Sequence, residues 1–197
     1  MPLQQTLVIF ARLPRMGTGK RRLAADVGAV EALRFQRHCL TTTLRKLAKD
    51  PRWRTWLALT PQASSMRHAR VHTISQPRGD LGRRMGTVAQ SMPSGPVVIV
   101  GSDIPDISRS HIAGAFRALG SHDVVFGPAA DGGYWLVGLR RRPRFINPFA
   151  GVRWSTPHAL ADTRAKLAGR RVALVETLDD VDTGADLRRH LQRRPAR

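Results

Sequence analysis

Short apolar segments rich in β-branched residues recur along the chain and alternate with segments in which apolar residues return every three or four positions. The short segments are typical of strands buried on both faces of a parallel sheet, and the longer ones of amphipathic helices. The predicted strands cover residues 6–11, 55–60, 69–74, 97–100, 123–128 and 172–175, with one more beginning at Tyr134. The predicted helices run from the loop ending at Leu23 to Leu47, from Asp80 to Gln90, from Ser108 to Leu119, from Thr156 to Leu167 and onward from Thr183. This alternation predicts an α/β fold.

The strand at residues 97–100 ends abruptly in small and acidic residues, among them Ser102 and Asp103, and Pro105 then prevents it from continuing. In an open α/β sheet, ligands bind beyond the carboxyl ends of the strands, where a carboxylate can hold a divalent cation against a phosphate. Asp103 is therefore a candidate metal ligand, and Ser108 is the expected N-cap of the next helix. The alternative is that Asp103 only hydrogen-bonds the backbone of its turn.

A basic loop follows the first predicted strand and contains Gly17, Gly19, Lys20, Arg21 and Arg22. Backbone amides in such a loop favour anions, and the side chains add formal positive charge, so the layout is that of a phosphate-binding loop. It is not a Walker A loop, because Arg15 and Arg21 hold the positions where that motif needs a glycine and a hydroxyl residue. The alternative is a solvated basic loop without a ligand.

The strand at residues 123–128 leads into an acidic glycine pair and two aromatic residues, Asp131, Gly132, Gly133, Tyr134 and Trp135. A hairpin turn would need only Asp-Gly. The Asp-Gly-Gly turn would let a backbone approach a ligand closely, the second glycine exceeds what a hairpin needs, and the two aromatic side chains would shape a pocket. This segment therefore favours a ligand contact over a plain turn.

Several other polar residues have an ordinary structural explanation. Asp80 and Thr156 are expected to cap helices, and Thr183 with Asp186 resembles a capping box. The histidines are isolated, without the spacing of metal ligands or of a carboxylate–histidine pair, and none is predicted to be a ligand or a base.

The formal net charge of +19 would ordinarily indicate a nucleic-acid partner. The 33 basic residues, however, are nearly all arginine and are scattered over every segment, without a zinc-finger, recognition-helix or aromatic RNA-binding pattern. We therefore expect no specific nucleic-acid partner, and a surface that favours small anionic substrates. The 14 carboxylates are scarce, and several follow predicted strands: Asp103, Asp106, Asp131, Asp179, Asp180 and Asp182. The roles of Asp180 and Asp182 stay open at this point.

The chain of 197 residues is long enough for one α/β domain, and no linker divides it, so residues 1–197 are predicted to form a single domain. The longest apolar runs are far below the roughly 20 residues needed to cross a bilayer, and no signal-peptide pattern precedes the first strand. Cys39 is the single cysteine, which excludes an intrachain disulfide. These features favour a cytoplasmic protein without a membrane segment.

Five motifs in a fixed order carry a resemblance that covers nearly the whole chain. They are residues 15–23, 79–85, 101–105, 127–136 and 154–156. Together they resemble an uncharacterised bacterial branch of the GT-A nucleotide-diphospho-sugar transferases, whose members are often named rSAM/selenodomain-associated transferases. The resemblance implies a three-layer α/β/α sandwich around a mostly parallel mixed sheet.

The same resemblance implies a nucleotide held over the first loop and a Mg²⁺ or Mn²⁺ ion at Asp103. The residues expected on this basis to bind the nucleotide are Arg12, Gly17, Lys20, Arg22, Asp80, Ser102, Gly132 and Gly133. Asp103 and Asp131 are the expected catalytic residues, the first through the metal and the second by positioning the acceptor or acting as a base. Within the first loop, Lys20, Arg22 and Leu23 match the family pattern, whereas Met16, Gly19 and Arg21 depart from it.

The reaction implied first is a metal-dependent transfer of a sugar from a nucleoside-diphosphate-linked donor to an acceptor that the sequence does not identify. The alternative is a nucleotidyltransferase, in which a phosphorylated acceptor attacks the α-phosphate of a nucleoside triphosphate and pyrophosphate leaves. A third interpretation is a catalytically degenerate protein that binds nucleotides without turnover. Fold alone does not decide among them.

Overall fold

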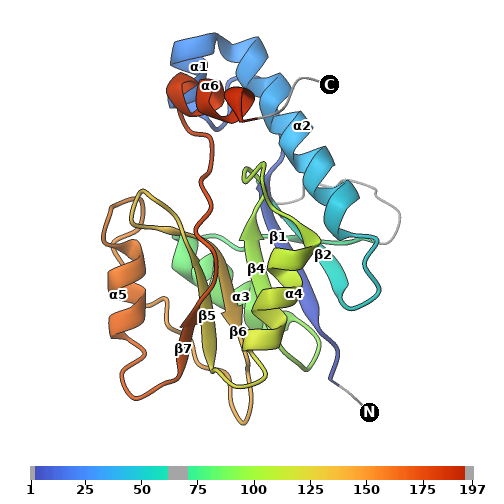
Figure 1. Ribbon diagram of the computed structural model, residues 1–197, viewed down its shortest axis with the longest axis vertical. Coiled ribbons are helices and arrows are strands. Elements are labelled where there is room, and N and C mark those ends of the chain that lie inside the picture. Colours follow the sequence, from blue (N-terminus) through green and yellow to red (C-terminus); the bar gives the residue numbers. More distant parts are fainter. Residues whose placement is uncertain (1–2, 62–70, 194–197) are drawn as a thin grey trace.

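The computed structural model describes residues 3–61 and 71–193, and its strands form one seven-stranded sheet (Figure 1). The strand order is β3-β2-β1-β4-β6-β5-β7. The strands are β1 (Thr6–Arg12), β2 (Arg54–Thr60), β3 (Val71–Ser75), β4 (Val97–Gly101), β5 (Val124–Pro128), β6 (Tyr134–Leu139) and β7 (Val172–Leu174). Each predicted strand is confirmed, apart from residues 69 and 70 of the third, which lie outside the described residues.

Among the strands described, only β6 runs antiparallel to its neighbours, β4 and β5, and the other pairs are parallel. The reversal follows from the short turn between β5 and β6, which is too short for the crossover that a parallel pair requires. The Ala129 N–H donates to the Gly133 carbonyl across this turn, at 3.1 Å. The predicted mostly parallel mixed sheet is therefore confirmed.

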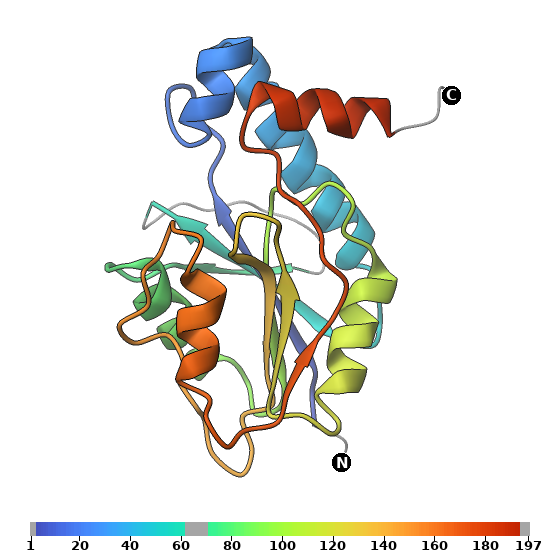
Figure 2. The same cartoon turned by 60° about the vertical axis from the view of Figure 1, so that its left-hand side comes forward.

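Helices cover both faces of the sheet, which makes three layers (Figures 1 and 2). On one face lie α2 (Ala29–Leu47) and α4 (Arg109–Ala118), and on the other lie α3 (Leu81–Ser91) and α5 (Ala159–Ala165). Their apolar faces meet the sheet in two separate buried clusters, one on each side. Alternate side chains of each central strand enter opposite clusters, which explains why these strands are apolar at nearly every position.

Two further helices, α1 (Arg21–Val27) and α6 (Gly184–Gln192), pack against each other beyond the carboxyl end of β1 (Figures 1 and 2). The Asp26 carboxylate accepts a hydrogen bond of 2.7 Å from the Gly184 N–H, so the first turn of α6 is tied to α1. We call α1, the start of α2 and α6 the upper lobe. It brings the first loop and the last loop of the chain together, although they are far apart in the sequence.

Two predicted helices differ in the structure. The helix predicted to run unbroken to Leu47 is divided at Gly28, whose φ of +87° lies outside the right-handed helical region. The helix predicted to begin at Thr156 begins at Ala159, because the Thr156 hydroxyl accepts from His158 N–H in a turn that precedes α5. The predicted caps at Asp80, Ser108 and Thr183 are all present: each side chain accepts from the backbone N–H three residues later.

Among the described residues, no helix is both long enough and apolar enough to cross a membrane.

Candidate functional site

The carboxyl ends of β1 and β4 lie side by side, with Phe10 opposite Gly101 in the register. Asp103 follows β4 by two residues, and Ser102 lies beside it. The Asp103 side chain is about one-third exposed, 35%, so it is accessible from solvent at the edge where the parallel strands end. The structure therefore places Asp103 where the sequence predicted it.

Two more carboxylates join Asp103. One oxygen each from Asp103, Asp180 and Asp182 lies within 4.8 Å of the others. Asp180 and Asp182 belong to the segment between β7 and α6, and the Asp182 N–H donates to the Asp186 carboxylate at 3.1 Å. That contact extends the capping box at Thr183, so the start of α6 fixes this part of the cluster. We call the three residues the acid cluster.

The Lys20 ammonium lies inside the acid cluster. Its Nζ atom is 2.6 Å from the Asp103 carboxylate, 2.6 Å from that of Asp182 and 3.5 Å from that of Asp180. The Lys20 side chain is only 8% exposed. Burial alone would lower the lysine pKa, but the charges and hydrogen bonds of Asp103 and Asp182 outweigh it and raise the pKa above its ordinary value.

The same surroundings favour the charged form of Lys20 and disfavour the charged form of Asp180. Burial raises the pKa of its carboxyl to about 6; the Lys20 charge opposes this, and the neighbouring carboxylates of Asp103, Asp182 and Asp131 add to it. A carboxyl in such surroundings is easier to ionise when a further cation enters.

A cavity of about 250 Å³ lies on the upper-lobe side of Asp103, and we call it the loop cavity. Its polar lining comprises Arg12, Lys20, Gln36, Ser102, Asp103 and Asp182. Cys39 also lines it, but burial raises the pKa of this thiol to about 12, so it is not a nucleophile at neutral pH. The loop cavity combines two cationic side chains with two carboxylates of the acid cluster, those of Asp103 and Asp182.

A second cavity, also of about 250 Å³, lies on the other side of Asp103 and is named here the aromatic cavity. Its walls include Phe10, Met85, Tyr134, Trp135 and Trp154, and its charged residues are Asp103, Asp131 and Asp180. No lysine, arginine or histidine is among the described residues that line it. The indole Nε1 of Trp154 is buried and finds no hydrogen-bond partner within the described residues.

The Asp131 turn forms part of the aromatic cavity, and its first glycine packs against another segment of the protein. A Cβ atom on Gly132, whose φ is +82°, would lie 2.1 Å from the Pro157 carbonyl oxygen. The close approach of these two segments therefore requires glycine at this position, and the contact of Gly132 with a nucleotide stays a prediction. Asp131 accepts a hydrogen bond of 2.9 Å from the Gly133 N–H, and both residues line the cavity.

The structure thus brings together most of the predicted site. Arg12, Lys20, Ser102 and Asp103 line the loop cavity, and Asp131 and Gly133 line the aromatic cavity. Four predicted nucleotide contacts line neither cavity: Gly132 packs against Pro157, Gly17 lines a separate hollow beside α1, Arg22 is exposed on α1, and Asp80 accepts from the Arg83 N–H as the cap of α3.

Sequence reasoning left Asp180 and Asp182 open, and the structure places both in the acid cluster. A run of acids after the last predicted strand, in a chain with only 14 carboxylates, marked this segment, but no local pattern placed it beside Asp103.

Comparisons with known proteins identify a family whose profile matches this chain and a crystal structure that superposes on it. A profile of the family described as "Uncharacterized protein conserved in bacteria (DUF2064)" matches residues 43–156. A crystal structure from Desulfovibrio desulfuricans G20, of a protein assigned as a nucleotide-diphospho-sugar transferase, superposes with a TM-score of 0.85 at 29% identity. That match covers 93% of this chain and 84% of that one.

Two further matches differ in how much of each chain they cover. The 2-phospho-L-lactate guanylyltransferase of Methanopyrus kandleri is 37% identical over 99 residues, which are 49% of this chain and 50% of that protein, so the match spans about half of the relative's length. Rv0371c from Mycobacterium tuberculosis H37Rv, solved in complex with manganese, matches with a TM-score of 0.56 at 17% identity. This match covers 97% of this chain and 100% of that one, and at this identity it shows only that the two proteins share a fold.

Membership of the rSAM/selenodomain-associated branch, which the motifs suggested, stays a prediction. The relationship to the nucleotide-diphospho-sugar transferases is confirmed. The chain has the fold of the nucleotide-diphospho-sugar transferases, and it belongs to the family described as "Uncharacterized protein conserved in bacteria (DUF2064)".

Proposed function

We propose that the protein is a metal-dependent nucleotidyltransferase, which joins the nucleoside monophosphate part of a nucleoside triphosphate to a phosphorylated acceptor and releases pyrophosphate. The observation that carries the proposal is the acid cluster between two cavities, one with cationic side chains and one without. The guanylyltransferase relative supports this reaction over sugar transfer, which is the reaction first implied by the motifs.

The acid cluster fits a Mg²⁺ or Mn²⁺ ion. Carboxylate oxygens are the ligands that these hard cations prefer, and three of them from Asp103, Asp180 and Asp182 converge within 4.8 Å. The manganese complex of Rv0371c, which shares the fold, is consistent with this choice. A divalent ion there would neutralise charge that develops on the phosphate oxygens during transfer.

The nucleotide phosphates would lie in the loop cavity. Lys20 and Arg12 supply positive charge beside the acid cluster, and the positive φ of Gly19, +71°, shapes the loop that carries Lys20. Asp103 lines both cavities, so a phosphate bound next to it is accessible from the opposite side.

The acceptor would lie in the aromatic cavity, with its phosphate at the end next to Asp103, where the divalent ion and the cationic side chains of the loop cavity would offset the phosphate charge. An oxygen of its phosphate attacks the α-phosphorus, a new phosphorus–oxygen bond forms, and the bond from the α-phosphorus to the bridging oxygen breaks as pyrophosphate leaves. A phosphate nucleophile is already ionised at neutral pH and needs no proton removed. Asp131 therefore positions the acceptor in this reaction.

A second candidate, sugar transfer from a nucleoside-diphosphate-linked donor, is favoured by one observation. The charged side chains that line the aromatic cavity are all acidic among the described residues, which suits a hydroxyl-bearing group better than a second anion. In that reaction the donor sugar occupies the cavity, and Asp131 acts as the base for the acceptor hydroxyl.

The released product decides between the two reactions. The full chain is incubated with Mn²⁺ and either nucleoside triphosphates plus a panel of sugar phosphates and other phosphorylated acceptors, or sugar nucleotides. Pyrophosphate release supports nucleotidyl transfer, and release of a nucleoside diphosphate supports sugar transfer. Stabilisation by a nucleotide in a thermal-shift assay without either product supports the binding-only interpretation, and the absence of any stabilisation by nucleotides contradicts the proposal.

A further inference from the structure

The ammonium of Lys20 occupies the place that a metal ion would need. Its Nζ atom is 2.6 Å from two carboxylates and 3.5 Å from the third, and these are the three residues of the acid cluster. On the basis of the proposed function, we propose that Lys20 is a displaceable counter-ion. It holds the acid cluster while nucleotide is absent and moves onto the nucleotide phosphates when a divalent ion takes its place.

The two cations exclude each other from this position. A divalent ion binds carboxylate oxygens at about 2.0–2.6 Å, so it would lie among the same oxygens that now contact the Lys20 Nζ atom. Two positive charges a few ångströms apart repel each other, and the Lys20 side chain, only 8% exposed, is poorly placed for water to screen that repulsion. The divalent ion therefore binds tightly only when the Lys20 ammonium can leave the carboxylates and contact another anionic group.

The lysine has that alternative within reach. Its side chain lines the loop cavity, where the proposed function places the phosphates, and Arg12 lines the same space. The lysine stem is flexible and carries its charge as a compact point, so the ammonium can turn from the carboxylates to a phosphate without a change in the backbone.

Two of the three carboxylates, by contrast, are carried by anchored backbone. The Asp182 backbone is held by Asp186, and the first turn of α6 is held to α1 through the hydrogen bond between Gly184 and Asp26. Asp103 follows a central strand of the sheet. Lys20 is therefore the movable member of the cluster.

Coupled binding follows from this exchange. Without nucleotide, a divalent ion competes with the lysine and binds weakly; with nucleotide, the phosphates accept the lysine and the ion binds tightly. Linkage requires the reverse as well, so the ion raises nucleotide affinity by the same factor.

The test is a titration of Mn²⁺ against the full chain, with free Mn²⁺ followed by electron paramagnetic resonance, in the presence and absence of each common nucleoside triphosphate. Lys20→Met is expected to bind Mn²⁺ at least about tenfold more tightly than the wild type when nucleotide is absent. It is also expected to show a smaller increase in Mn²⁺ affinity when nucleotide is added.

Two further variants make the result decisive. Lys20→Gly removes the charge at a position whose φ of +41° and ψ of +43° suit glycine, so it tests the charge without backbone strain. Lys46→Met is the matched control, because the Lys46 Nζ atom donates to the carbonyls of Pro105 and Ile107, at 2.9 and 3.2 Å, and its loss should leave Mn²⁺ affinity unchanged.

The outcomes separate this inference from the proposed function. One outcome would be that the wild type binds Mn²⁺ in the presence of nucleotide, but neither Lys20 variant binds Mn²⁺ more tightly than the wild type without it. In that case the proposed exchange of Lys20 for the ion is wrong, and the proposed metal site at the acid cluster is retained. If neither the wild type nor the variants bind Mn²⁺ under any condition, both proposals fail.

Discussion

The two cavities that meet at Asp103 have the same volume, about 250 Å³ each, and opposite chemistry. The loop cavity contains Arg12 and Lys20 beside the acid cluster. The aromatic cavity contains indole, phenol and aliphatic groups, and its charges are all carboxylates among the residues described. The comparison separates a part suited to phosphates from a part suited to a group of low charge.

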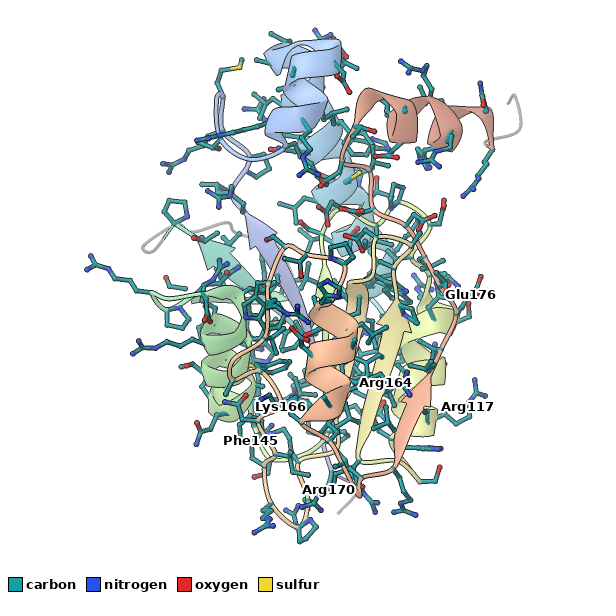
Figure 3. All side chains as sticks on the ribbon, turned by 90° about the vertical axis from the view of Figure 1, so that its left-hand side faces the viewer. Arg117, Phe145, Arg164, Lys166, Arg170 and Glu176 are labelled. Carbon is teal, nitrogen blue, oxygen red and sulfur yellow. The ribbon has the colours of Figure 1, made fainter. Side chains whose placement is uncertain are left out.

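The contrast also shows that net charge is a poor guide to the site. The chain carries +19, yet its basic side chains extend over many elements. Figure 3 labels Arg117 on α4, Arg164 on α5, and Lys166 and Arg170 in the segment before β7, and none of these four residues lines either cavity. What matters for binding is where single charges lie, and two cationic side chains at the loop cavity are enough to define its preference.

The largest effect is expected where both cavities meet. Asp103→Asn removes a carboxylate that contacts Lys20 and lines both cavities, so turnover should fall by about 1000-fold. The Mn²⁺-dependent part of the thermal stabilisation by nucleotide should also disappear. Asp106→Asn, at an exposed acid three residues on, is the control and should keep both. Full retention of the Mn²⁺-dependent shift in Asp103→Asn would show that the metal assignment is wrong.

The next largest effect concerns the loop cavity alone. Arg12→Gln should weaken nucleotide binding by about tenfold, because a charge-assisted contact to phosphate contributes about 1.5–3 kcal/mol. Arg22→Gln should change it by less than about twofold, since Arg22 is exposed on α1 and does not line the cavity. Isothermal titration with nucleotide and Mn²⁺ measures both constants. Equal losses in the two variants would mean that the phosphates extend along α1, as the motif comparison first implied.

A smaller effect is expected in the aromatic cavity. Asp131→Asn should lower turnover by about tenfold or more while nucleotide and Mn²⁺ still stabilise the protein as in the wild type, because Asp131 faces the acceptor side. Steady-state rates and thermal shifts on the same preparation give the two readouts. Loss of nucleotide binding in this variant would contradict the assignment of the nucleotide to the loop cavity and the acceptor to the aromatic cavity.

The smallest effect is on stability and depends on pH. The folded protein holds the pKa of Asp180 at about 6, above its value in an unfolded chain, so the ionised carboxylate destabilises the fold and this penalty grows as pH rises through that range. Asp180→Asn should therefore melt a few degrees above the wild type at pH 7.5 without metal. The gain should shrink at pH 5, and melting curves at both values check it. A gain that is equal at the two pH values would mean that the charge is not its cause.

The parts of the fold that local sequence decides were predictable. Asp80, Ser108 and Thr183 cap helices because a short polar side chain before an apolar run satisfies free N–H groups, and the structure contains all three caps. Asp103 was predictable for a similar reason, since the end of a buried strand marks the edge of a parallel sheet.

The parts that depend on distant segments were not predictable. Asp180 and Asp182 join Asp103 only because the loop after β7 crosses to the carboxyl end of β4, which no local pattern records. The packing of Gly132 was not predictable for the same reason, because its neighbour is the Pro157 carbonyl, from a segment more than twenty residues away.

The reversed direction of β6 has a consequence for the aromatic cavity. Because the strand runs against its neighbours, its first residues, Tyr134 and Trp135, stand at the same edge where the parallel strands finish. Neither residue lines the loop cavity. Substitutions at these two positions can therefore reshape one wall of the aromatic cavity and leave the loop cavity unchanged.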